Sequence, residues 1–129
     1  MAGDPANFAA IARADIALDP VPFNGGLSSA DALWMVVPLI SLRGASLVGR
    51  LGASMLSRVG LADLVAASEA DYVRIASDLA GDRGRLAAMR AGMRQRLAHA
   101  SLANGRIIAA EVEEAYRDLW RHWCRKWTG

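Results

Sequence analysis

The chain has 129 residues, of which 53% are hydrophobic, and its formal net charge at pH 7 is +2. This length provides for one hydrophobic core and excludes two ordinary domains. Arg, Asp, Gly or Pro interrupts every apolar stretch before the roughly 18 to 20 residues that a membrane-spanning helix needs, so we expect no membrane partner.

The first residues, the single cysteine and the basic residues restrict the possible functions further. The first residues contain no basic region followed by an apolar run, which argues against a secretory signal and favours a cytoplasmic location. Cys124 is the single cysteine and has no Cys or His around it at metal-ligand spacing, so we expect neither an internal disulfide nor a metal site. The 15 basic residues are all arginine except Lys126, and this mild bias does not by itself indicate a nucleic-acid partner.

The first 26 residues predict a helix, a strand and a loop. Residues 6–14 place apolar side chains at helical spacing, and residues 15–19 read as a short strand that Pro20 ends. Residues 20–26 contain two prolines and two glycines, which exclude regular structure. A shaped loop is therefore expected at the carboxyl end of the first strand.

A second helix and a second strand follow this loop. Ser28 or Ser29 is expected to cap the helix, which must end before Pro38, and residues 39–42 predict the strand. A strand, a helix and a strand within about 30 residues form the unit from which parallel sheets are built, with a right-handed crossover.

Beyond Gly44 the pattern predicts helices only. Ser68 with Asp71 three residues later resembles a weak capping box, Asp82 is placed to cap the following helix, and a last long helix is expected over about residues 106–126. Two strands cannot make a stable parallel sheet with both faces covered. We therefore expect an incomplete α/β domain whose further strands lie upstream or in a partner chain.

The Gly-rich loop is the strongest candidate for a binding site. A glycine turn that leads from a strand into a helix leaves backbone amides free at the positive end of the helix dipole, where phosphate binds. Ser28 and Ser29 add hydroxyl donors. Asp31 either stabilises the helix start through the dipole or accepts hydrogen bonds from ribose hydroxyls. A Gly-Gly turn with a serine cap also ends many ordinary strands, so this pattern alone leaves both interpretations open.

Several runs of residues, in their order along the chain, resemble one known family. They are Asp15-Ile16-Ala17-Leu18-Asp19-Pro20, Asn24-Gly25-Gly26, Ser28 to Met35 with Asp31, Val37-Pro38, Arg50 to Ser54, and Glu114 to Trp120. Together they resemble the second lobe of bacterial O-GlcNAc transferases of the SPINDLY-like glycosyltransferase family. The resemblance implies a partial Rossmann-like α/β fold, the GT-B second lobe, with a short parallel strand pair and a helical carboxy-terminal half. Residues 1–129 would be the distal half of a nucleotide-sugar-binding lobe.

The resemblance also implies an activity and a set of site residues. The activity is O-linked glycosyl transfer from UDP-GlcNAc or a related nucleotide sugar, with no metal or other cofactor. Gly26, Leu27 and Ser28 match the positions that hold the diphosphate, and Asp31 matches the aspartate that holds the ribose. The whole binding set expected is Asn24, Gly25, Gly26, Leu27, Ser28, Ser29 and Asp31. The family's catalytic residues belong upstream of this sequence, so the chain is expected to be inactive alone.

The sequence departs from the family pattern in three places. Leu27 and Ser28 replace a pair of hydroxyl residues, which removes at least one phosphate hydrogen bond worth about 0.5 to 1.5 kcal/mol. Val36 stands where the family usually has glycine, and Arg43 stands where it usually has proline. These changes leave the expected fold unaltered and weaken the expected grip on the donor.

The last helix carries an aromatic stripe that needs a partner. Tyr116, Trp120, Trp123 and Trp127 recur at helical spacing on one face. The resemblance implies that a first lobe, or a partner chain, packs on this stripe, and stacking on nucleic acid is the lesser alternative. Besides the donor-binding lobe, a second hypothesis therefore stays open: a non-enzymatic, truncated paralogue that recruits a protein through this helix.

Overall fold

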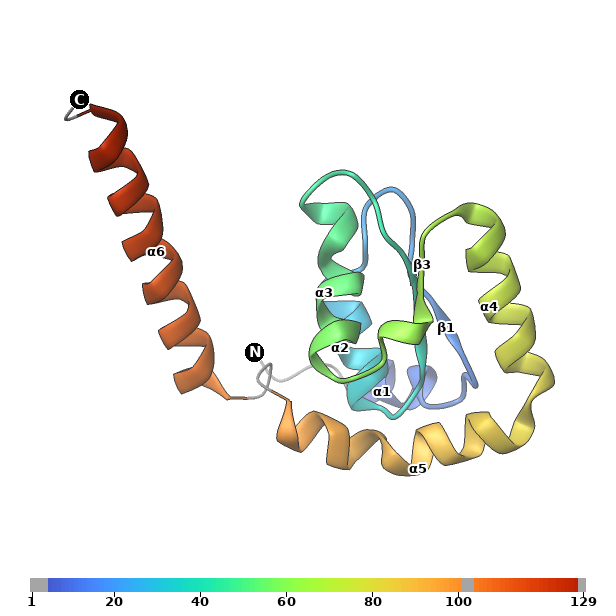
Figure 1. Cartoon of the computed structure of the whole chain (residues 1–129). Helices are drawn as coiled ribbons and strands as arrows, with labels where there is room; N and C mark the ends of the chain where they lie inside the picture. The colour runs from blue at the N-terminus through green and yellow to red at the C-terminus, as the bar shows by residue number, and fades with distance from the viewer. Residues whose placement is uncertain (1–4, 101–103, 128–129) are drawn as a thin grey trace.

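The computed structural model describes residues 5–100 and 104–127. Its centre is a parallel sheet of β1 (Ala17–Leu18), β2 (Leu39–Leu42) and β3 (Val65–Ala66) in the order β1-β2-β3. Ala17 pairs with Leu39 and Ser41 pairs with Val65, so β2 is the middle strand. The loops that leave the three strands meet at the upper edge of the sheet in Figure 1. The expected class, a partial Rossmann-like α/β fold with parallel strands and a helical carboxy-terminal half, is confirmed.

The third strand corrects the expectation that only helices follow Gly44. β3 has two residues and comes directly after the short 3-10 turn Ala62–Leu64, so it is too short to show the alternation by which strands are recognised. It exists because its backbone pairs with β2, which is a long-range interaction. The first strand is also shorter than the expected 15–19.

Helices cover both faces of the sheet. Those before the last strand are α1 (Pro5–Ile11), α2 (Leu27–Trp34) and α3 (Leu51–Arg58), the last preceded by the 3-10 turn Val48–Arg50; those after it are α4 (Glu69–Gly81), α5 (Arg83–His99) and α6 (Gly105–Trp127). α3 and α4 both pack on β2, and they lie on opposite sides of the sheet in Figure 1. α5 runs across the lower end and contacts both α2 and α4.

The helix starts confirm two expected caps and correct a third. Ser68 Oγ accepts a hydrogen bond from Asp71 N at 3.1 Å, and Asp82 Oδ1 accepts one from Arg85 N at 2.8 Å. Neither Ser28 nor Ser29 caps α2, because the helix already begins at Leu27 and its N-cap is Gly26. Both serines therefore lie within the first turn of the helix.

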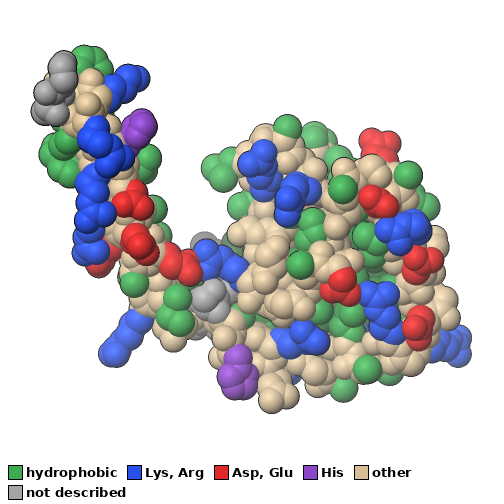
Figure 2. All heavy atoms as spheres, viewed as in Figure 1, with side chains coloured by type: hydrophobic (Ala, Val, Ile, Leu, Met, Phe, Trp, Pro, Cys, Tyr) green, Lys and Arg blue, Asp and Glu red, His purple; other side chains and the backbone are tan. Residues whose placement is uncertain are grey.

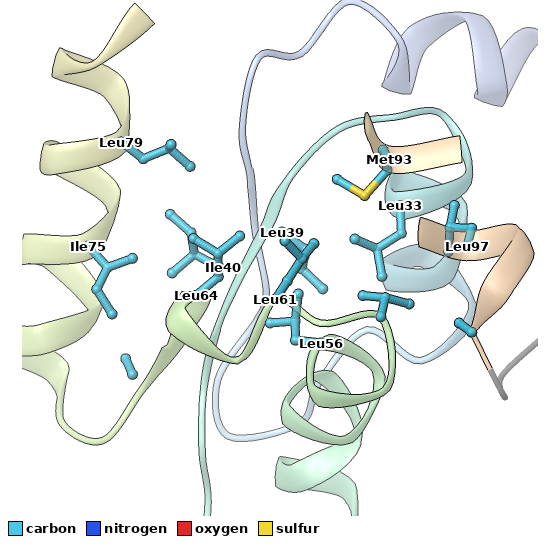
Figure 3. Packing of buried hydrophobic residues seen from close by; sticks show 13 residues of the cluster. Leu33, Leu39, Ile40, Leu56, Leu61, Leu64, Ile75, Leu79, Met93 and Leu97 are labelled. Atoms are coloured by element: carbon cyan, nitrogen blue, oxygen red, sulfur yellow. The ribbon is translucent and has the colours of Figure 1, made fainter. Parts of the chain in front are cut away.

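The core forms around β2, whose side chains alternate between the two faces (Figure 3). Ile40 points toward Ile75 and Leu79 of α4, whereas Leu39 points toward the side where α2 and α5 pack. The largest fully buried side chains of this core are Leu33, Leu39, Ile40, Leu56, Leu61, Leu64, Leu79 and Met93. A middle strand that is buried on both faces holds the upper sheet edge in a defined position.

α6 stands apart from the rest of the molecule in Figure 1. None of its residues is buried, and a salt bridge of 2.7 Å joins Glu111 Oε2 to Arg58 Nη2 at the end of α3. Over the described residues, no helix is both long enough and apolar enough to span a bilayer.

Candidate functional site at the start of α2

Asp19 organises the loop between β1 and α2. Its side chain is only 1% exposed. Oδ1 accepts hydrogen bonds from Gly25 N at 2.9 Å and from Ser29 Oγ at 2.7 Å, and Oδ2 accepts one from Ser41 Oγ at 2.7 Å. The loop therefore curls around a buried carboxylate that also reaches β2.

Asn24 fastens the same loop to the start of α3. Its backbone amide donates to Val48 O at 3.2 Å, and its Nδ2 donates to Pro20 O at the same distance. Its Oδ1 accepts a hydrogen bond from Gly52 N at 3.2 Å. The Asn24 side chain is buried and bonds only to protein groups, so it stabilises the shape of the loop.

The first turn of α2 leaves several amides free. Ser28 N donates to Gly25 O and Ala30 N donates to Gly26 O. Among the hydrogen bonds of residues 5–100 and 104–127, none uses the backbone amides of Gly26, Leu27 or Ser29. Gly26 has a φ of 56°, a left-handed conformation that glycine adopts without strain, and a Cβ there would meet nothing within 4 Å. These three amides lie at the positive end of the helix dipole.

The side chains of this turn divide between the solvent and the interior. Leu27 is 83% exposed, and Ser28 is exposed with its Oγ donating to Gly25 O at 2.9 Å. Ser29 is buried against Asp19. Of the two serines expected to offer hydroxyls to a ligand, only Ser28 lies at the surface.

Asp31 lies one turn further along α2. It is four positions after Leu27, which puts both side chains on the same face of the helix. The residue is half-buried, and its carboxylate makes no hydrogen bond or ion pair with any described residue. Because α2 has no acidic residue in its first turn, Asp31 gains little from the dipole, and its carboxylate is available to a ligand.

A cavity of about 420 Å³ opens beside this loop at the carboxyl edge of the sheet. Loops after all three strands line it, and Val21, Asn24, Arg43, Ser46 and Ser68 are among the lining residues. Figure 2 shows basic side chains over this upper edge. Arg50 Nε donates to Gly44 O at 3.1 Å, so this arginine braces the second loop. The crevice outside the carboxyl ends of parallel strands is where ligands bind in open α/β folds.

A model of glycosyl transferase family 41 matches residues 10–112, which include β1, the loop and all of α2. The chain belongs to glycosyl transferase family 41. The resemblance seen in the sequence is thereby confirmed.

The relatives of this family 41 chain are much longer proteins. The probable UDP-N-acetylglucosamine–peptide N-acetylglucosaminyltransferase SPINDLY of Arabidopsis thaliana is 35% identical over 111 residues, which are 86% of this chain and 12% of that protein. The UDP-N-acetylglucosamine–peptide N-acetylglucosaminyltransferase of Caenorhabditis elegans is 30% identical over 110 residues, 85% of this chain and 10% of that protein. The chain thus spans about an eighth or less of these relatives.

A solved structure agrees with the same assignment. A mutant O-GlcNAc transferase of Thermobaculum terrenum superposes with a TM-score of 0.79 at 36% identity, covering 96% of this chain and 24% of that one. The family 41 fold therefore extends over nearly all of the described elements.

The three departures from the family pattern occupy different places. Leu27 is the first residue of α2 and projects into solvent beside the free amides. Val36, two residues after α2 ends, has a φ of 59°. Arg43 is exposed at the rim of the cavity, and its backbone amide donates to Ala66 O at 3.0 Å. The loop after β2 thus accepts an arginine without losing its contact with β3.

Asp19 shapes this site, Ser41 and Gly52 lie behind its carboxylate, and all three are absent from the set that the sequence predicted. A Cβ on Gly52 would collide with Asp19 Oδ2 and Ser41 Oγ, so the start of α3 approaches the carboxylate only because residue 52 is glycine. One signal could have pointed to Asp19: it is an acidic residue directly before Pro20, at the carboxyl end of the first strand. Ser41 and Gly52 gave no signal, because their contacts cross 22 or more residues of sequence.

The aromatic stripe lies on α6, away from this site. Tyr116, Trp120, Trp123 and Trp127 are 52–68% exposed. Trp120 and Trp123 stack with ring centroids 5.2 Å apart. Within the described part of the chain, no cluster of His, Cys, Asp and Glu has the arrangement a metal ion needs, so neither region holds such a cluster.

Proposed function

We propose that this chain grips the diphosphate and the ribose of UDP-GlcNAc, or of a related nucleotide sugar, as part of an O-linked glycosyltransferase. The observation that carries the proposal is the start of α2, where the amides of Gly26, Leu27 and Ser29 have no partner among the described residues and Asp31 lies one turn away. This is the chemistry that a phosphate followed by a ribose requires. The names of the two curated relatives, which state that sugar nucleotide, support the choice of donor.

Within the set of site residues, we propose two kinds of role. Gly26 and Leu27 contact the diphosphate through their amides, Ser28 contacts it when its exposed hydroxyl turns from Gly25 O to the ligand, and Asp31 accepts hydrogen bonds from the ribose. Asn24, Gly25 and Ser29 act mainly by shaping the loop, since their polar groups already bond to the protein, while the Ser29 amide faces the ligand. Such a site would place the donor and stabilise the leaving diphosphate.

We propose that residues 1–129 form the distal half of a GT-B nucleotide-sugar-binding lobe that is incomplete as it stands. β1 pairs only with β2 among the described residues, which leaves an edge where further strands can add. The purified chain should therefore bind UDP weakly and turn over no UDP-GlcNAc. A cytoplasmic location remains a prediction, which fractionation of cells that express the chain would test.

Titration with UDP followed by NMR tests the binding proposal. We expect amide shifts confined to residues 25–31, and we expect Asp31→Asn to weaken them because the ribose loses its acceptor. Asp15→Asn is the matched control, since Asp15 is exposed and its carboxylate bonds to no described residue. Shifts elsewhere, or equal effects of the two variants, would contradict the proposal.

The second candidate function is recruitment of a protein through α6. The exposure of Tyr116, Trp120, Trp123 and Trp127 favours it, because large exposed apolar patches mark interaction surfaces. We propose that a first lobe, or a partner chain that supplies one, packs there. Concentration-dependent association that Trp120→Ala and Trp123→Ala remove, in a chain that ignores UDP, would favour this function over donor binding.

A further inference from the structure

The hydrogen bonds of Asp19 differ from an ordinary helix cap. In an ordinary cap, a side-chain oxygen accepts from the second or third amide of the helix and thereby uses it up. Here Asp19 Oδ1 accepts from Gly25 N, before the helix, and from the Ser29 hydroxyl, and the N-cap Gly26 has no side chain. The carboxylate therefore anchors both flanks of the first turn and leaves the amides of Gly26, Leu27 and Ser29 free.

The position of Asp19 restricts it to an indirect role. It is 1% exposed, so it cannot touch a ligand bound at the free amides. Its Oδ2 accepts from Ser41 on the middle strand, and its backbone oxygen accepts from Tyr72 Oη at 2.8 Å. Hydrogen bonds to a carboxylate are roughly twice as strong as those between neutral groups. Asp19 is thus held from behind by two separate contacts, one to β2 and one to α4.

We propose that Asp19 is a positioning residue for the nucleotide diphosphate. By holding Gly25 and Ser29 it keeps the amides of Gly26, Leu27 and Ser29 free and ordered for an anionic ligand. The inference rests on the proposed function, since it assigns the diphosphate to this turn. A residue that does not touch the nucleotide would thus set the geometry on which the affinity for the nucleotide depends.

Two serines provide a matched pair for the test. Ser29 and Ser41 are 3% and 0% exposed, and each donates one hydroxyl hydrogen bond of 2.7 Å to Asp19. Ser29→Ala releases the first turn of α2, whereas Ser41→Ala removes one anchor behind Asp19 and leaves its contacts with Gly25, Ser29 and Tyr72 in place. We expect both to lower the melting temperature by similar amounts. We expect Ser29→Ala to raise the Kd for UDP about fivefold and Asp19→Asn to raise it about tenfold, while Ser41→Ala changes it less than about twofold. Equal changes in the two serine variants, in proportion to their stability, would overturn the positioning role.

A measurement without nucleotide separates this inference from the proposed function. The heteronuclear NOE of the Gly26, Leu27 and Ser29 amides reports their order directly. We expect it to fall in Asp19→Asn and Ser29→Ala and to stay at the wild-type value in Ser41→Ala. If the wild-type chain ignores UDP but this pattern holds, the proposed function fails and the positioning role stands. If the amides keep their order in Ser29→Ala, the positioning role fails, and this comparison decides even if Asp19→Asn does not fold.

Discussion

Val36 takes the same place after α2 that Gly60 takes after α3. After α3, Leu61 N donates to Leu56 O and Gly60 N donates to Ser57 O, with Gly60 at a φ of 71°. After α2, Val37 N donates to Ala32 O and Val36 N donates to Leu33 O, with Val36 at a φ of 59°. Both ends are Schellman motifs, in which the left-handed residue is usually glycine. The valine is therefore strained where the family's glycine would not be.

We predict that Val36→Gly stabilises the chain. A left-handed conformation costs an L-residue roughly 1 to 2 kcal/mol, and this relief is offset only in part by the about 0.4 to 1 kcal/mol of chain entropy that a glycine loses on folding and by the packing of a half-buried side chain. We expect the free energy of unfolding in urea to rise by about 0.5 kcal/mol. Met35→Gly is the control, because Met35 has an ordinary φ of −80° and should only lose stability. A loss of stability in both variants would show that Val36 is not strained.

The second prediction concerns Gly52, where the backbone of α3 lies against Asp19 and Ser41. The Cβ in Gly52→Ala would collide with Asp19 Oδ2 and Ser41 Oγ, and the rigid surroundings of these atoms cannot move aside. We expect a destabilisation of about 3 kcal/mol in chemical denaturation. Gly81→Ala is the matched control in the last turn of α4, where a Cβ meets nothing within 4 Å. That variant should gain about 0.4 to 1 kcal/mol.

The parts of the site that sequence could predict are those that depend on neighbouring residues. The loop at Asn24-Gly25-Gly26 was predictable, because prolines and glycines exclude regular structure locally, and the Ser68 and Asp82 caps were predictable from their own neighbours. The network around Asp19 was not, since its partners Ser41 and Gly52 come into reach only when β2 and α3 pack. Local chemistry is visible in sequence, and contacts across the fold are not.

The same limit explains the third strand and the free amides. β3 is defined by pairing with β2, and two residues carry no periodicity. The sequence predicted an anion site at this turn and also predicted a serine cap there, although a serine cap would have used up one of the amides. The positive φ of Gly26 sets where the helix begins and which amides stay free. The neighbouring residues do not predict this conformation.

Leu27 offers a gain-of-binding prediction. Its exposed side chain stands beside the free amides where the family usually carries a hydroxyl residue. We expect Leu27→Thr to restore a phosphate hydrogen bond and to tighten UDP binding by about 0.5 to 1.5 kcal/mol. Leu27→Ala separates the two causes, because it removes the apolar bulk without adding a hydroxyl. Isothermal titration should rank Thr above Ala, and an equal gain for both would mean that only the bulk mattered.

Tyr72 predicts a loss of stability at alkaline pH. Burial, and then the charge of Asp19, raise the pKa of the Tyr72 hydroxyl above its ordinary value of 10.0. Below pH 10 the phenol is neutral in both states and its stabilisation is complete. As the pH rises from 10 through the folded pKa, the unfolded state releases its proton first, so stability falls. Tyr72→Phe should lose about 0.5 to 1.5 kcal/mol at pH 7 and lack this alkaline decline in urea melts recorded from pH 8 to 11.

The contact between Glu111 and Arg58 predicts how α6 responds to acid. The hydrogen bond from Arg58 lowers the pKa of the Glu111 carboxyl below its ordinary 4.5. The contact is therefore complete above pH 4.5 and is lost as the pH falls through the lower folded value. Below that pH we expect α6 amides to gain mobility in ¹⁵N relaxation, and Glu111→Gln should show the same mobility at pH 7. Glu113→Gln is the control, since Glu113 pairs with Arg117 within α6 and does not bridge to α3. If both variants leave α6 unchanged at pH 7, the Arg58 contact does not hold the helix, and only a partner on the aromatic stripe can place it.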